Sequence, residues 1–126
     1  MDDRDIAKIS TLGLAHVGDG VYELLTRTRL CEMGITTVVR LHRETVARVN
    51  ATAQSCAAEK IMPYLTDAER DIFKRGRNTR VNSMPKSSDA AQYHAATGLE
   101  ALFGWLYLRG EHSRIDTLFS IILEDS

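Results

Sequence analysis

The stretch from Tyr93 to Leu108 is apolar almost all round, and it constrains the fold more than any other part of the chain. A helix without a polar face is stable only when it is buried on nearly every side. The one acidic residue in this stretch, Glu100, shares a helical stripe with Phe103 and Tyr107. A carboxylate in that stripe is costly to bury unless it is paired, protonated or bound to a metal ion. The alternative is a Glu that reaches the edge of the helix and pairs with an arginine.

A second apolar stretch, from Leu14 to Glu23, contains the triplet Gly18-Asp19-Gly20. Aspartate and glycine are poor helix formers, so the triplet lowers the stability of any helix that contains it. It indicates either that some group closely approaches this backbone and carboxylate, or that a turn separates two short helices. Asp19 and Glu100 are the two carboxylates that lie within strongly apolar helical segments.

The remaining segments predict an all-α fold of five to seven helices, because no convincing length of the chain alternates with period two. Capping residues and stop signals set the expected bounds. Helices are expected over 10–32, over 36–62 in one or two pieces, from Asp67 onward, from a cap at Ser87 or Ser88 to about 108, and over 112–124. Residues 1–9 are expected to be a loosely docked terminus, and 1–126 to form one domain.

The apolar residues of the first long helix predict which of its faces enters the core. The expected stripe consists of Leu14, Val17, Val21, Leu24, Leu25 and Thr28. It leaves Asp19 on the other side, so a second helix or a second subunit would have to close over that carboxylate.

A basic run lies between the two acidic stretches, on a chain whose net charge is −1. No acidic residue interrupts it between Asp71 and Asp89. Its members are Lys74, Arg75, Arg77, Arg80 and Lys86, and most of them fall in an expected loop over 76–88. Such a local concentration of positive charge favours phosphate binding, and a solvated loop without a partner is the alternative.

Taken in order, these segments resemble the ribonuclease III family. LAHVGDGVYE resembles the family's signature helix, and TGLEALFGWLYL resembles its second acidic helix. The segments 49–54 (VNATAQ), 75–78 (RGRN) and 85–89 (PKSSD) are similar to those of the Mini-ribonuclease III subfamily, a catalytic domain without a double-stranded RNA-binding domain. The resemblance covers about residues 10–110.

The resemblance implies a Mg²⁺-dependent endoribonuclease that cuts double-stranded RNA and leaves 5′-phosphate ends. It implies that Asp19 and Glu100 are the catalytic pair and bind the metal, which agrees with the preference of Mg²⁺ for carboxylate oxygens. The residues expected to hold the RNA backbone are Arg75, Arg77, Asn78, Arg80 and Lys86. The resemblance further implies a homodimer, a substrate in the stem of the 23S ribosomal RNA precursor, and assistance from a ribosomal protein bound to that precursor.

Two departures from the family pattern concern the metal. The wider family has a Glu four positions before Asp19 and an Asp three positions before Glu100, where this chain has Ala15 and Thr97. With fewer carboxylates, we expect the site to bind metal ions more weakly and the activity to depend on millimolar Mg²⁺. The same departures motivate a second hypothesis, an inactive RNA-binding or ribosome-binding scaffold. Gln54 is interpreted as a helix-surface residue, with a sugar hydroxyl of the RNA as its alternative partner.

The sequence also indicates where in the cell the protein is expected. No apolar run approaches the roughly 18 residues that span a bilayer, and the acidic start does not resemble a signal peptide. Cys31 and Cys56 have no metal-like spacing and are expected to be reduced and partly buried. We therefore expect a cytoplasmic protein.

Overall fold

The computed structural model describes residues 1–79 and 89–124, which contain seven α-helices, a short 3₁₀ helix and no strand. The elements are α1 (Asp3–Ala7), α2 (Thr11–Glu32), α3 (Val38–Arg48), α4 (Ala51–Ile61), η1 (Met62–Tyr64), α5 (Asp67–Asn78), α6 (Ala90–Leu108) and α7 (His112–Leu123). The predicted all-α fold of five to seven helices is confirmed.

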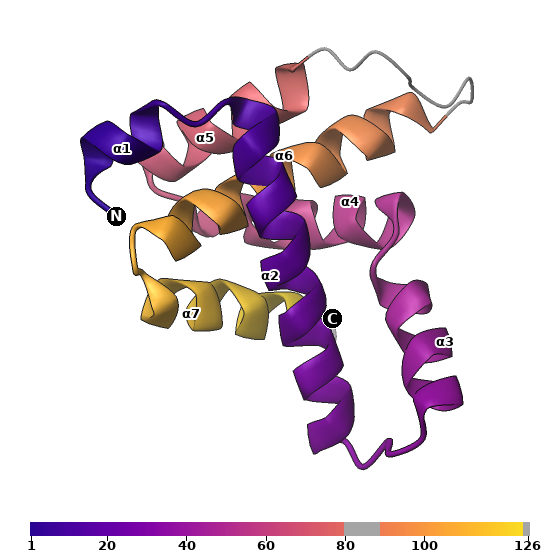
Figure 1. Ribbon diagram of the computed structural model, residues 1–126. Helices are drawn as coiled ribbons and strands as arrows, with labels where there is room; N and C mark the ends of the chain where they lie inside the picture. Colours follow the sequence, from indigo (N-terminus) through magenta and orange to yellow (C-terminus); the bar gives the residue numbers. More distant parts are fainter. Residues whose placement is uncertain (80–88, 125–126) are drawn as a thin grey trace.

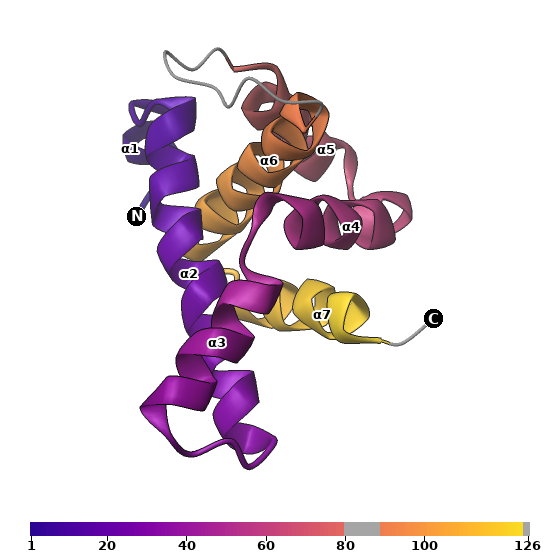
Figure 2. The same ribbon diagram turned by 90° about the vertical axis from the view of Figure 1, so that its right-hand side faces the viewer.

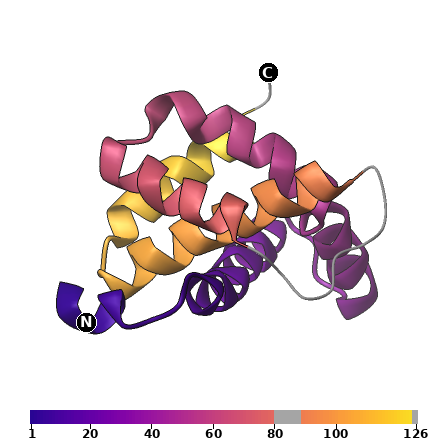
Figure 3. The same cartoon turned by 90° about the horizontal axis from the view of Figure 1, so that it is seen from above.

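Helix α6 is the centre of the molecule, as its composition predicts. It crosses behind α2 and lies among α4, α5 and α7 (Figures 1 and 3). Leu99, Leu102 and Phe103 are completely buried within the main hydrophobic core. Helix α3 runs back beside the second half of α2, and the two form an arm that projects from the rest of the bundle (Figure 2).

The crossing of α2 and α6 explains the glycine at position 18. A Cβ atom built on Gly18 would lie 1.6 Å from the carbonyl oxygen of Glu100, and one on Gly104 would lie 1.9 Å from that of Leu14. The two backbones therefore touch where each helix contributes a glycine, Gly18 in α2 and Gly104 in α6. Helix α2 runs unbroken through the triplet, so the alternative of a turn at this point is wrong.

The predicted helix ends are largely confirmed. The Ser10 hydroxyl accepts a hydrogen bond from the backbone of Gly13, and Gly34, just beyond α2, has a φ of 92°. Thr66 and Glu69 form the reciprocal capping box expected at the start of α5. The N-cap of α6 is Asp89 rather than the expected Ser87 or Ser88, which lie outside the described residues.

The prediction of a loosely docked terminus over 1–9 is wrong. Asp2 caps α1, and Ile6 is only 4% exposed in a small core cluster with Leu14. The amino group of Met1 donates a hydrogen bond to the carbonyl oxygen of Leu108, and Arg109 forms an ion pair with Asp3. The acidic start obscured Ile6, the buried residue of this segment, and the contacts that Met1 and Asp3 make with the end of α6.

The predicted core stripe of α2 is only partly confirmed: Leu14 is buried, and Val21 and Leu25 are partly buried against the main core. The residues that are buried are Leu14, Ala15, Gly18, Tyr22, Thr26 and Leu30, whereas Leu24 is 66% exposed. The error has a physical reason: Gly18 marks the closest contact of the helix, and a pattern of large apolar side chains does not count a glycine. Helix α6 of the same chain packs beside the Asp19 region, and Asp19 itself remains exposed.

Two further expectations need correction. Residues 76–78 belong to the last turn of α5 rather than to a loop. Cys31 and Cys56 are free, as expected, but both are exposed rather than partly buried. Among the residues that the structure describes, no helix has the length and apolar character needed to cross a membrane.

Candidate active site

Three helices bring polar side chains together at the crossing of α2 and α6. Asp19 comes from α2, Glu100 from α6 and Gln54 from α4. The backbone contact of Gly18 with Glu100 sets the spacing, because it places the residue after Gly18 beside the Glu100 side chain. Asp19 is exposed, while Glu100 is half-buried. The structure thus places together the two carboxylates predicted to form the catalytic pair.

The carboxyl group of Glu100 has a strongly perturbed affinity for protons. Burial raises its pKa to about 8, and a hydrogen bond with Asp19 and the negative charge of Asp19 act in the same direction. A contact with Gln54 opposes them and favours the ionised form. At neutral pH, the raised pKa therefore favours the protonated form of Glu100.

Gln54 was predicted to lie on the helix surface, and this is wrong: the residue is only 4% exposed. Its Nε2 atom is buried and makes no hydrogen bond of normal geometry, although the amide faces Glu100 closely enough to affect its pKa. Only an indirect feature of the sequence indicates that Gln54 is buried. The small residues Ala57 and Ala58 are buried in the main core beside Gln54, on a helix that packs against α6.

The two positions at which family carboxylates are missing lie in the same region. Ala15 and Thr97 are both buried, and the Thr97 hydroxyl donates to the carbonyl oxygen of Tyr93 at 3.0 Å. Within 1–79 and 89–124, no group of three or more His, Cys, Asp or Glu side chains could hold a metal ion. Two carboxylates and an amide are nonetheless an oxygen-rich set that suits Mg²⁺, which usually keeps several of its waters.

The predicted RNA-binding residues are only partly described. Arg75, Arg77 and Asn78 are exposed on the last turn of α5. The guanidinium of Arg75 donates to the Thr11 hydroxyl at 3.3 Å, and that of Arg77 lies over the ring of Phe73. Neither arginine forms an ion pair with a described residue. The other two predicted residues, Arg80 and Lys86, lie outside the described residues.

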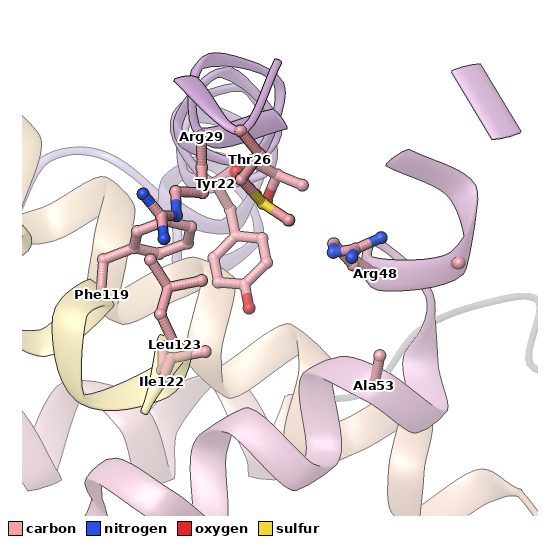
Figure 4. A pocket seen from close by; sticks show the side chains of 10 residues that line it. Tyr22, Thr26, Arg29, Arg48, Ala53, Phe119, Ile122 and Leu123 are labelled. Carbon is pink, nitrogen blue, oxygen red and sulfur yellow. Dashed lines mark hydrogen bonds between the residues drawn. The ribbon is translucent and has the colours of Figure 1, made fainter. Parts of the chain in front are cut away.

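A hollow of about 420 Å³ opens between α2, α3, α4 and α7, without Asp19 or Glu100 in its lining (Figure 4). Arg29 and Arg48 face it from opposite sides, and the hydroxyl of Tyr22 points into it. Burial raises the pKa of Tyr22 to about 12, so its hydroxyl is neutral at physiological pH. The hollow lacks a carboxylate, and the acidic pair is therefore the stronger candidate for phosphodiester chemistry.

Comparison with proteins of known family and structure identifies the class to which this helical fold belongs. Residues 12–111 match the Ribonuclease III domain family. A crystal structure of a protein from Fusobacterium nucleatum superimposes with a TM-score of 0.85 at 32% identity, covering 96% of this chain and 98% of that one.

Curated relatives narrow this class. Mini-ribonuclease 3 of Symbiobacterium thermophilum is 47% identical over 104 residues, which are 82% of this chain and 80% of the relative. Mini-ribonuclease 3 of a Thermoanaerobacter species is 40% identical over 119 residues, 94% of this chain and 84% of the relative. The chain belongs to the ribonuclease III family and, within it, to the Mini-ribonuclease 3 group of endoribonucleases.

Proposed function

We propose that this endoribonuclease cuts double-stranded RNA with Mg²⁺ held by Asp19 and Glu100. The observation that carries the proposal is the half-buried carboxyl of Glu100, which the contact of two helix backbones fixes against Asp19. A carboxyl with a strongly raised pKa beside a second carboxylate is typical of a functional site. A scaffold would have no need for this arrangement.

The protein's own residues have distinct parts in this proposal. Bound Mg²⁺ would activate water and stabilise the charge that develops at phosphorus. Glu100 would have to give up its proton before it could act as a ligand, whereas Asp19 is exposed to solvent. With Ala15 and Thr97 in place of carboxylates, Asp19 and Glu100 would hold the ion with more of its waters retained, and we expect a requirement for millimolar Mg²⁺.

The proposed substrate is the base-paired stem of the 23S ribosomal RNA precursor, cut in the cytoplasm to leave 5′-phosphate and 3′-hydroxyl ends. A ribosomal protein bound to the precursor would present the stem. The resemblance described above supports this choice, with 1–126 acting as one catalytic domain.

The exposed arginines at the end of α5 support the RNA contact. Recognition of an A-form duplex relies on its phosphates and shape, and each phosphate contact adds to the salt dependence of binding. We expect Arg77→Ala to weaken duplex binding at low salt and to reduce the slope of log K against log salt by about 1, uniformly across sequences. Filter binding at several salt concentrations measures both effects, and an unchanged slope would remove Arg77 from the interface.

An apolar groove between α2, the end of α6 and the first half of α7 supports a homodimer. Its lining consists of Val17, Gly20, Val21, Leu24, Leu25, Tyr107, His112, Ile115 and Asp116. Leu24 is 66% exposed and Tyr107 is 46% exposed, so the groove presents large apolar surface. Since one site cuts one strand, two sites related by a two-fold axis are needed to cut both. A second copy of the chain is therefore the proposed occupant.

The dimer leads to a specific prediction. A charge in a buried apolar contact is strongly unfavourable, so Leu24→Glu should shift the protein from dimer to monomer without lowering the helix content. Analytical ultracentrifugation and circular dichroism measure the two quantities. Leu12→Glu, at another exposed leucine (41%) that does not line the groove, is the matched control. A wild type that is monomeric at micromolar concentration would contradict the proposal.

Glu100 also predicts how stability depends on pH in the absence of metal. Its folded pKa of about 8 lies above the ordinary value of 4.5, so between these values only the folded state keeps the proton. Unfolding then releases a proton, and the free energy of unfolding should fall as pH rises from about 5 to 8. Urea denaturation in EDTA at several pH values tests this, and Glu100→Gln should flatten the profile.

The deciding experiment uses a perfectly paired RNA duplex at low salt, with Mg²⁺ in one reaction and EDTA in the other. Double-strand cuts that depend on Mg²⁺ and leave 5′-phosphates support the proposed activity. A protein that binds the duplex but never cuts it with any divalent ion would be the RNA-binding scaffold instead.

A further inference from the structure

The amide of Gln54 is polar, buried and without a normal hydrogen bond, and the fold alone gives no reason for it. Leaving a buried N–H group unpaired is energetically unfavourable. The side chain is 4% exposed, its Nε2 atom has no partner among the described residues, and the amide faces Glu100. An apolar residue of similar size would avoid that cost.

Hydrogen bonds at the start of α4 fix the position of Gln54. Asn50 is the N-cap of α4: its side chain accepts a hydrogen bond from Ala53 and donates to the carbonyl oxygens of Val46 and Ala47 at the end of α3. The backbone N–H of Gln54 donates to the carbonyl oxygen of Asn50. The junction of α3 and α4 thus sets the direction in which Gln54 points.

We propose that Gln54 is a positioning residue that donates its Nε2 hydrogen bond to the ionised carboxylate of Glu100 and thereby holds that carboxylate in the orientation that binds a divalent cation. This inference rests on the proposed function, because it assumes that Glu100 is a ligand. An amide suits this role because it is neutral and adds no charge to the metal site, and because its donor has no other described partner. Residues that orient metal ligands typically change affinity or activity 10–100-fold when they are replaced.

The test compares Gln54→Met with wild type. Methionine has nearly the same length, but it cannot donate a hydrogen bond. We expect binding of Mn²⁺ in the absence of RNA, followed by electron paramagnetic resonance, to weaken about tenfold or more. The Mg²⁺ concentration for half-maximal cleavage should rise by a similar factor, while duplex affinity in Ca²⁺ and the melting temperature in EDTA stay the same or increase.

The matched control is Gln92→Met, the same substitution at a glutamine whose side chain accepts a hydrogen bond from Thr52. It should leave Mn²⁺ binding unchanged. Gln54→Ala provides a second variant if methionine does not fit, with all affinities measured where circular dichroism shows a folded protein. Wild-type Mn²⁺ affinity in the folded variants would overturn the inference, even if the wild type cuts duplex RNA. A wild type that does not cut would overturn the proposed function instead.

Discussion

Asp19→Asn should abolish double-strand cleavage while leaving duplex binding intact. The substitution keeps the shape of the side chain but removes the negative charge that is proposed to hold the metal beside Glu100. We expect the rate to fall by about 10³-fold or more, equivalent to about 4 kcal/mol of lost transition-state stabilisation. Single-turnover cleavage in Mg²⁺ measures the rate, and duplex affinity in Ca²⁺ shows whether the variant still binds.

Glu23 provides the matched control for this prediction. It lies one turn after Asp19 on the same helix, but its carboxylate pairs with Arg27 at 2.8 Å and is substantially exposed. Exposed ion pairs of this kind contribute little, so Glu23→Gln should cleave within about threefold of wild type. If both variants lost activity equally, a general effect of charge on α2 would explain the result, and the specific role of Asp19 would be contradicted.

The acidic pair could be predicted because of its contrast with the surrounding residues. A lone carboxylate in the apolar stretch 93–108 needs a special environment, and the structure gives Glu100 one beside Asp19. Gln54 offers no such contrast, since an amide in a helix with several alanines is ordinary on a surface. Its burial follows only from how closely α4 approaches α6, and that distance is set by tertiary packing.

The error in the predicted core face of α2 comes mainly from its glycine at position 18. The pattern of large apolar residues predicts that Leu24 is buried, although it is exposed. The same pattern omits Gly18, which makes the closest contact of the helix. The roles proposed for Arg80 and Lys86 remain predictions, because they lie outside the described residues.

Gly18→Ala should strongly destabilise the protein, because among the glycines this is the position at which an added Cβ would come closest to another atom. The new Cβ would lie 1.6 Å from the carbonyl oxygen of Glu100 and 2.5 Å from its carbonyl carbon, and these backbone atoms cannot rotate away. The helices must therefore move apart along their longest contact. Overpacking usually costs 1–3 kcal/mol, and we expect more than about 3 kcal/mol here, with a melting temperature lower by more than about 10 °C.

Gly20→Ala tests whether that loss comes from the helix crossing rather than from glycine in α2 as such. A Cβ on Gly20 meets no atom within 4 Å, so the substitution removes only the conformational freedom of glycine, and alanine favours a helix by about 0.5–1 kcal/mol. Because Gly20 lines the groove proposed for the second copy, both glycine substitutions are compared in the monomeric Leu24→Glu background. In thermal unfolding followed by circular dichroism, Gly20→Ala should be at least as stable as that parent protein. Two residues apart, the same added methyl group should thus have opposite effects, because α6 touches the backbone of α2 at Gly18 and leaves it free at Gly20. Equal losses at the two positions would mean that this contact is not what holds Asp19 beside Glu100.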